Sequence, residues 1–353
     1  MSNDRTESSK INRRGFLRGA VAAVATAVAA AFIPEKTALG QADDEYPYQV
    51  YLPYVVVPRR PHGPSKLGIH TIFQNNALTY IQAIAEQGAH LATVKAVDKF
   101  SWLQQVKDAS PQTLNVGRST KFADTVDLGK DLAEEARRVM DILLPEMEAH
   151  REYVDYWEVT NEMDLLDADD YRRHAEIHFH FIDIAEREGF KIALFTWYAG
   201  TPEWEEMEGV VETGIFARAK EGGHILSLHE GTFAPPVTTG YGEPLPGRPR
   251  YPDRGILCCR YRWLYEDFLK PRDEVVPLLM TEFGMGPYAS TGFQPAEWVA
   301  QMAWYDDRMR EDDYVLSCCP FTLGPGTWPQ WQIYDWEEAL PDYAQYIIRL
   351  KDG

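Results

Sequence analysis

Two apolar stretches of this sequence end in carboxylates that could act together on one bond. Residues 156–162 read YWEVTNE and residues 278–284 read LLMTEFG. Glycoside hydrolysis uses two carboxyl groups that flank the anomeric carbon, one as acid/base and the other as nucleophile or base. We therefore predict that Glu162 is a general acid/base and Glu282 a nucleophile, provided that the fold brings them together.

The elements that must position these residues alternate along the chain. Apolar runs typical of strands follow one another with amphipathic runs at helical spacing between them. Each crossover then carries a helix, which demands parallel strands, and eight such units predict a single-domain (β/α)8 TIM barrel. A doubly wound open sheet is the alternative, but no glycine-rich dinucleotide fingerprint follows any strand. We expect strands at 67–72, 91–97, 113–117, 154–160, 191–197, 224–228, 275–281 and 314–319, and helices at 77–87, 101–107, 128–150, 168–188, 203–220, 259–269, 295–310 and 337–350.

A barrel places its chemistry at the C-terminal ends of its strands. Glu162 follows the fourth predicted strand and Glu282 the seventh, so both face the same mouth. Other polar and aromatic residues also gather at the predicted strand ends and the loops beyond them. The candidate substrate-binding residues are Asn161, His70, Arg118, Trp197, Tyr198, His229, Glu230, Trp328 and Trp331.

Asn161-Glu162 after strand four and Thr281-Glu282-Phe283-Gly284 after strand seven resemble the signature of clan A glycoside hydrolases, the "4/7" retaining barrels. The resemblance implies a retaining glycoside hydrolase that cleaves a β-glycosidic bond by double displacement. Glu162 would protonate the leaving oxygen and then activate water, while Glu282 would form a glycosyl-enzyme. Asn161 would bond the sugar 2-hydroxyl.

The chain is similar to family 5 of that clan but departs from it at two positions. That family carries His-x-Tyr after strand six, where this chain has His229-Glu230-Gly231, and a Trp ending strand eight, where none occurs before Trp328. We therefore assign no family. A swap of roles with Glu230 stays open, and either Arg118 or His229 is expected to keep Glu282 ionised and oriented.

Aromatic residues supply a platform on which the apolar faces of sugar rings can stack. Those expected at the active rim, about half of which should serve packing alone, are Trp197, Tyr198, Trp204, Trp328, Trp331, Tyr334 and Trp336. The long loop at 232–254 is expected to form one wall of the cleft.

We predict no cofactor and assign no residue to a metal site. His174, His178 and His180 lie on the helix after strand four, and we expect them to be exposed on the outside of the barrel. A metal-dependent barrel hydrolase usually needs His-x-His after strand one, where only His70 is present. This class and a catalytically inactive carbohydrate-binding barrel are the alternative functions.

The N-terminus resembles a twin-arginine (Tat) signal peptide at 1–40, with Arg13-Arg14 before an apolar run that is short for a bilayer span. An uncleaved anchor is the alternative. A leader at 41–66 and a catalytic domain at 67–353 would follow, in a secreted, extracytoplasmic protein without an integral membrane segment. Without residues 1–40, which hold six Lys/Arg and three Asp/Glu, the net charge changes from −19 to −22. A charge this negative excludes nucleic acid as a binding partner, and it is compatible with a polysaccharide or glycoside as the partner.

The cysteines form two adjacent pairs, Cys258-Cys259 and Cys318-Cys319, whose spacing is not a zinc pattern. Buried thiols are the first interpretation, and a disulfide between the two pairs is the second, because the exterior is oxidising.

Overall fold

The computed structural model describes residues 60–121, 126–232, 234–326 and 328–352. The predicted signal peptide and residues 41–59 of the predicted leader lie outside the described residues, so the boundaries at 40 and 66 stay predictions. Across the described ranges, no helix is long and apolar enough to cross a membrane.

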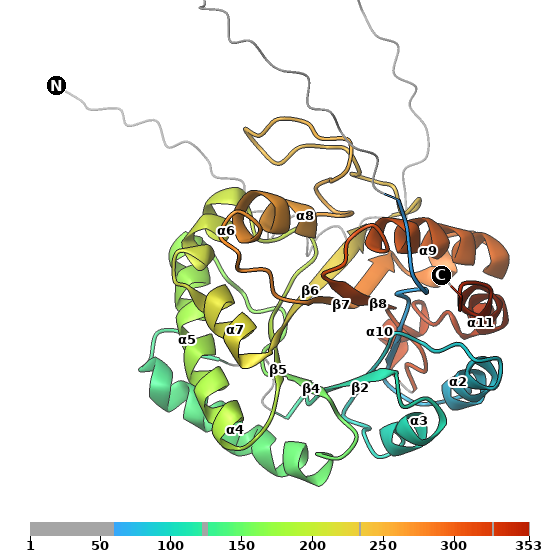
Figure 1. Cartoon of the computed structure of the whole chain (residues 1–353), viewed down its shortest axis with the longest axis horizontal. Helices are drawn as coiled ribbons and strands as arrows, with labels where there is room; N and C mark the ends of the chain where they lie inside the picture. The colour runs from blue at the N-terminus through green and yellow to red at the C-terminus, as the bar shows by residue number, and fades with distance from the viewer. Residues whose placement is uncertain (1–59, 122–125, 233, 327, 353) are drawn as a thin grey trace, which may run out of the picture. The chain divides into compact units, whose positions relative to one another are not determined.

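Eight parallel strands follow one another around a barrel in the order of the chain, with the helices outside them (Figure 1). Isolated parallel bridges join Leu67 to Cys318 and Thr71 to Leu323, so the first strand meets the last and the barrel closes. The predicted (β/α)8 fold is confirmed. The strands are β1 (Ile69–Thr71), β2 (Thr93–Val97), β3 (Leu114–Arg118), β4 (Tyr156–Glu158), β5 (Ile192–Trp197), β6 (Ile225–Thr232), β7 (Leu278–Met285) and β8 (Val315–Pro320).

The helices largely follow the predicted ranges, and side-chain caps fix several of their starts. Asp131 accepts a hydrogen bond from the Glu134 amide, so α4 begins four residues later than predicted. The predicted helix 203–220 is two helices, because Gly214 adopts a left-handed φ of 79° between them. The α-helices are α2 (Ala77–Glu86), α3 (Leu103–Ala109), α4 (Leu132–Ala149), α5 (Ala168–Arg187), α6 (Trp204–Val211), α7 (Ile215–Gly222), α8 (Tyr261–Leu264), α9 (Pro295–Met309), α10 (Pro329–Gln332) and α11 (Leu340–Arg349), with a π-helical turn η1 (Tyr265–Leu269) and 3₁₀ turns η2 (Tyr288–Ser290) and η3 (Glu337–Ala339).

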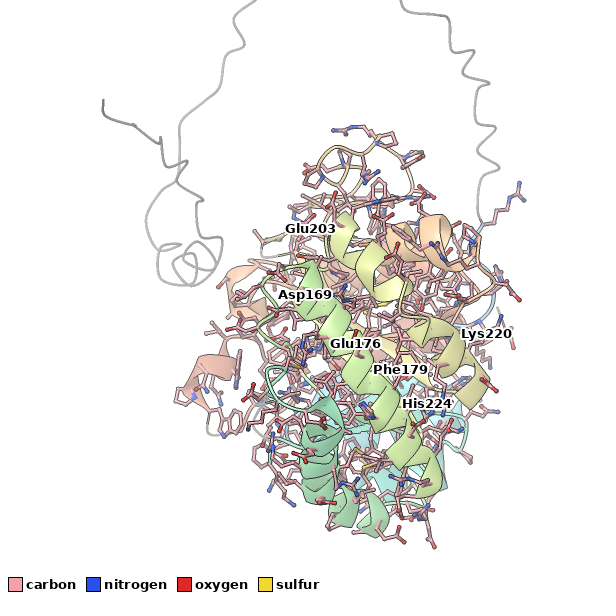
Figure 2. All side chains as sticks on the ribbon, turned by 90° about the vertical axis from the view of Figure 1, so that its left-hand side faces the viewer. Asp169, Glu176, Phe179, Glu203, Lys220 and His224 are labelled. Carbon is pink, nitrogen blue, oxygen red and sulfur yellow. The ribbon has the colours of Figure 1, made fainter. Side chains whose placement is uncertain are left out.

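The histidines of α5 are not exposed as expected. His174 and His178 are fully buried, whereas Asp169 and Glu176 lie on the solvent side of the same helix (Figure 2). The two imidazoles are one turn apart and continue the apolar stripe that packs on β5. The indole of Trp197 donates a hydrogen bond to His174 Nδ1 over 3.3 Å, and burial lowers the pKa of His174 to about 3. These side chains are neutral packing groups. His180, which we also expected to be exposed, is half-buried.

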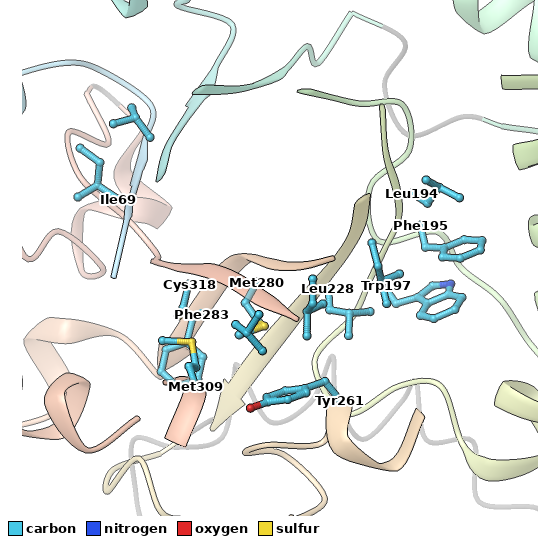
Figure 3. Packing of buried hydrophobic residues seen from close by; sticks show 14 of the residues in the cluster. Ile69, Leu194, Phe195, Trp197, Leu228, Tyr261, Met280, Phe283, Met309 and Cys318 are labelled. Atoms are coloured by element: carbon cyan, nitrogen blue, oxygen red, sulfur yellow. The ribbon is translucent and has the colours of Figure 1, made fainter. Parts of the chain in front are cut away.

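Large side chains fill the layer between the strands and the surrounding helices (Figure 3). Trp197 stacks on Phe195 of the same strand with ring centroids 4.2 Å apart, and the same core cluster includes Met280 and Phe283 on β7 and Cys318 on β8. All four cysteines are buried free thiols, which agrees with the first of the two interpretations.

Candidate active site

A cavity of about 490 Å³ opens at the C-terminal ends of the strands. Its lining draws on the ends of all eight strands or the loops that follow them. Of the predicted site residues, it contains His70, Arg118, Asn161, Glu162, His229, Glu230, Glu282, Trp328 and Trp331.

Glu162 and Glu282 meet across this cavity. One carboxylate oxygen of each lies within 4.8 Å of the other, and the His229 ring contributes a nitrogen within the same distance. Both carboxylates keep access to the cavity, with 31% of the Glu162 side chain and 16% of the Glu282 side chain exposed. These nearest oxygens are closer together than the roughly 6.5–9.5 Å at which inverting enzymes hold their carboxyl groups.

Four basic side chains surround one oxygen of Glu282. The distances to Glu282 Oε1 are 3.0 Å from Lys95 Nζ, 3.5 Å from Arg118 Nη1, 3.5 Å from His70 Nε2 and 3.8 Å from His229 Nε2. Burial favours the neutral acid, but His229, Lys95 and His70 together outweigh it and hold the pKa of Glu282 well below its usual range. Glu282 is therefore a carboxylate at neutral pH.

His70 contributes as a neutral group. Burial lowers the pKa of His70 to about 4, against the opposing effect of Glu282. Its Nδ1 lies 2.7 Å from Thr322 Oγ1 on the far side of the ring. Its Nε2, on the opposite side of the ring, lies 3.5 Å from Glu282 Oε1, so the neutral imidazole borders this carboxylate.

Glu162 is held by one backbone contact and one side-chain contact. Its amide donates to Thr196 O over 2.9 Å, and its φ of 44° is a left-handed conformation that costs a non-glycine residue roughly 1 kcal/mol or more. His229 Nδ1 lies 2.7 Å from Glu162 Oε1. His229 therefore contacts both carboxylates, and its shorter contact is to Glu162 rather than to Glu282.

Asn161 is 6% exposed and borders the cavity beside Glu162. Its side-chain oxygen Oδ1 is buried and has no hydrogen-bond partner among the described residues. Buried amide oxygens are almost always paired. Asn161 therefore has an unused acceptor next to Glu162.

Two predicted site residues lie outside the cavity lining. Trp197 is 2% exposed, outside the cavity lining, and packs between β5 and α5, so a substrate-binding role for it is wrong. Tyr198 is 42% exposed but also lies outside the lining. Successive strand residues face opposite sides of the sheet, so a strand end does not by itself place a side chain in the mouth.

Glu230 borders the cavity, but its carboxylate points away from Glu162 and Glu282. Oε1 accepts from the Tyr261 amide over 2.6 Å and Oε2 accepts from the Tyr305 hydroxyl over 2.7 Å. Burial raises the pKa of Glu230 to about 7, although these hydrogen bonds oppose the rise. A swap of roles between Glu230 and Glu282 is therefore excluded by orientation, because His229 occupies the inward position of β6.

Sequence reasoning missed two charged residues of the barrel interior, Lys95 and Glu158. Both side chains are 0% exposed, and Lys95 Nζ lies 2.9 Å from Glu158 Oε2. The sequence did contain a signal, namely a charged residue within a predicted strand. Parallel strands are buried on both faces, so their sequences are normally almost continuously apolar. The run LATVKAV at 91–97 is interrupted only by Lys95 and Thr93.

One side of the cavity is aromatic. Phe321, at the end of β8, packs on His70 with centroids 4.8 Å apart and meets Trp331 and Tyr334 edge-on. These three rings line the cavity together with Trp328, which is 41% exposed. Two other candidate platform residues serve packing instead: Trp336 is buried against Trp298, and Trp204 packs on Phe268.

Glu162, His229 and Glu282 also form a group of the kind that could ligate a metal ion. The charges around them argue against one. The ammonium of Lys95 and the guanidinium of Arg118 already lie within 3.5 Å of Glu282 Oε1 and would repel a divalent cation.

Comparison with known proteins gave matches among solved structures alone: no family model and no curated protein matches this chain. A glucosidase from Croceicoccus marinus shares 11% identity and a TM-score of 0.47, covering 83% of this chain and 68% of its own. A β-mannanase from Thermomonospora fusca shares 14% identity and a TM-score of 0.41, covering 77% and 84%. A glycoside hydrolase family 30 subfamily 8 xylanase from Clostridium acetobutylicum shares 10% identity and a TM-score of 0.48, covering 84% and 73%. At these values no activity or residue role is transferred to this chain.

Proposed function

We propose that this protein is a retaining glycoside hydrolase that cleaves a β-glycosidic bond by double displacement. One observation carries the proposal: oxygens of Glu162 and Glu282 lie within 4.8 Å across the barrel mouth. Retaining enzymes hold their carboxyl groups about 5–5.5 Å apart, so that one attacks the carbon whose leaving group the other protonates.

In the first step Glu282 attacks the anomeric carbon. Its pKa is held well below the usual range, against burial, by His229, Lys95 and His70, so the carboxylate is ready to form the new bond. The bond to the leaving oxygen breaks with its electron pair going to that oxygen, which takes the proton of Glu162. His229 Nδ1, 2.7 Å from Glu162 Oε1, fixes the direction of that carboxyl group.

In the second step Glu162, now a carboxylate, accepts a proton from water as the water oxygen bonds to the anomeric carbon. The ester bond breaks and its electron pair returns to Glu282. The unpaired Asn161 Oδ1 can accept a hydrogen bond from a sugar hydroxyl throughout, and a bond that shortens at the transition state would accelerate both steps.

The substrate we propose is a neutral or cationic polysaccharide or glycoside. The net charge of −19 disfavours a polyanion. The large hydrophobic residues that are exposed within the described ranges all belong to loops or short elements that follow the C-terminal ends of β1, β4, β5 and β8, where sugar rings can stack on the aromatic ones. They are Phe73, Leu166, Tyr198, Trp328 and Ile333.

We further propose that the protein is exported by the Tat pathway and acts outside the cytoplasm. The support is the sequence of residues 1–40, with Arg13-Arg14 followed by a short apolar run. Fusing these residues to a reporter protein, with Arg13 and Arg14 each replaced by Lys as the control, tests this part independently of the enzymology.

A screen of aryl β-glycosides and polysaccharides tests the catalytic proposal. Wild type should hydrolyse at least one sugar with retained anomeric configuration, and Glu282→Ala should lose turnover. Glu162→Ala should keep activity on 2,4-dinitrophenyl glycosides, whose leaving group needs no proton, and azide should rescue it. Glu208→Ala, an exposed carboxylate on α6, is the matched control. Full activity of Glu282→Ala, or inverted products, would refute the mechanism, and binding without hydrolysis would indicate a carbohydrate-binding barrel.

A further inference from the structure

The barrel interior contains one cation that two carboxylates share. Lys95 Nζ, from β2, lies 2.9 Å from Glu158 Oε2 on β4 and 3.0 Å from Glu282 Oε1 on β7. A side chain from β2 that reaches β4 and β7 must cross the inside of the barrel. Lys95 and Glu158 are 0% exposed, so water stabilises neither charge.

Glu158 is fixed without any contribution from a substrate. The Ser227 hydroxyl donates to Glu158 Oε1 over 3.0 Å, and Ser227 Oγ lies 2.7 Å from Thr281 Oγ1, next to the nucleophile in sequence. Burial opposes ionisation of Glu158, but Lys95, with His229 and Arg118, outweighs burial and lowers its pKa. The titratable or charged groups that face the Lys95–Glu158 pair are His70, Arg118, His229, Glu282 and the thiol of Cys319, whose pKa burial raises to about 12.

The reaction moves one negative charge from Glu282, which contacts Lys95, to Glu162. When Glu282 forms its ester with the anomeric carbon, its electron pair becomes a covalent bond and the oxygen next to Lys95 is no longer anionic. The proton of Glu162 leaves with the departing group. A buried ammonium that loses its only counter-ion is strongly destabilised. Lys95 would meet this problem in the glycosyl-enzyme if Glu282 were its sole partner.

We propose that Glu158 is the permanent counter-ion of Lys95, which lets Lys95 keep Glu282 ionised before attack without becoming an unpaired buried charge in the glycosyl-enzyme. This role rests on the proposed function. Glu158 is a positioning residue, because it acts through Lys95 and has no place in the cavity lining.

Glu158→Gln tests the role with little change of shape. The amide can still accept from Ser227 and has no charge. The glycosyl-enzyme and the transition state before it then contain an unpaired Lys95, so kcat/KM should fall at least about 100-fold on 4-nitrophenyl glycosides of the sugar that the screen identifies. Hydrolysis of the intermediate restores the Glu282 charge, so kcat should fall less than kcat/KM. Any pre-steady-state burst of 4-nitrophenol should disappear.

A second variant separates charge from structure. The double variant Lys95→Met/Glu158→Gln removes both members of the pair and leaves no unpaired charge. Its kcat/KM should be at least tenfold higher than that of Glu158→Gln. The acid limb of its kcat/KM–pH profile should move to higher pH, because Lys95 no longer favours the ionised form of Glu282. Glu135→Gln is the matched control: Glu135 is also buried and paired, with Arg138, but lies on α4 away from the cavity, and its rates should equal those of wild type.

An unchanged kcat/KM in Glu158→Gln, or a double variant no faster than Glu158→Gln, would overturn the proposal. A measurement without substrate accompanies these assays: carbon-13 carboxyl NMR titration of labelled glutamates in the full-length protein. The pKa of Glu282 should be higher in the double variant than in wild type, and an equal pKa would overturn the role of Lys95. Wild type that cleaves no glycoside would instead refute the proposed function itself, whatever the titration shows.

Discussion

The buried carboxyl of Glu230 makes the stability of this protein depend on pH in a direction opposite to that of most carboxylates. Burial raises its pKa from 4.5 to about 7 in the folded state. The folded protein therefore binds more protons than the unfolded chain between these pH values, and its free energy of unfolding falls as pH rises through that window. At about 1.4 kcal/mol for each pH unit, the loss amounts to about 3 kcal/mol.

Glu230→Gln should abolish this dependence, because the amide resembles the protonated acid at every pH. The Tyr261 amide can still donate to its oxygen, and the Tyr305 hydroxyl can accept from its NH₂ group. We expect the variant to be more stable than wild type at pH 8 by up to about 3 kcal/mol, and similar to it at pH 4.5. Urea unfolding at both pH values, in wild type and variant, measures the difference.

The same variant tests the assignment of the reacting groups. Because Glu230 faces away from Glu162 and Glu282, Glu230→Gln should retain turnover. The reasoning is refuted if the free energy of unfolding of the two proteins changes with pH in parallel. Loss of all turnover in a folded Glu230→Gln protein would refute the assignment of Glu282 as nucleophile.

Three further predictions concern other parts of the site and its supports. Burial lowers the pKa of His174 from 6.5 to about 3, so its neutral form stabilises the fold above pH 6.5 and this contribution is lost as pH falls; His174→Gln should reduce the loss of unfolding free energy between pH 6.5 and 5 by about 2 kcal/mol, measured by urea unfolding. Trp328→Ala should raise KM for a polysaccharide while leaving the thermal midpoint nearly unchanged, whereas Trp197→Ala should cost about 3–5 kcal/mol of stability; a larger effect of Trp197→Ala on KM than on stability would contradict its place in the core. The acid limb of the kcat/KM–pH profile should lie below pH 4.5, because His229, Lys95 and His70 lower the pKa of Glu282 against the effect of burial. An acid limb near pH 6 would contradict this lowering of the Glu282 pKa.

Much of the architecture could be predicted because it depends on pattern alone. The alternation of apolar runs with helical spacing predicted eight strands, and counting them placed Glu162 and Glu282 at the fourth and seventh. Helix boundaries were less predictable where one residue decides them, as Gly214 does between α6 and α7. The predicted pairing of the two carboxylates needed no side-chain detail, since both strand ends meet at one mouth.

The errors arose where a side chain can face either of two sides. Trp197 ends its strand but points outward to His174, and the carboxylate of Glu230 faces Tyr261 and Tyr305. His174 was expected to be exposed because its helix lies on the outside of the barrel, but it belongs to the face of that helix that is buried. Lys95 was missed because the search for site residues considered only the ends of the strands. Lys95 lies within a strand, and only the structure shows which carboxylates its side chain contacts across the barrel interior.

The two carboxylates to which we assign the proposed reaction differ in how they are attached to the barrel. Glu282 belongs to a strand that pairs with neighbours on both sides, and it is in register with His229 on β6. Glu162 stands beyond β4 in an irregular segment that one amide hydrogen bond connects to Thr196. Under the proposed mechanism, replacement of residues 163–167 by other loop sequences should therefore alter which leaving groups the enzyme accepts, while Glu282 stays in place. Protein engineering could therefore vary the segment that carries Glu162 while leaving the strand that carries Glu282 unchanged.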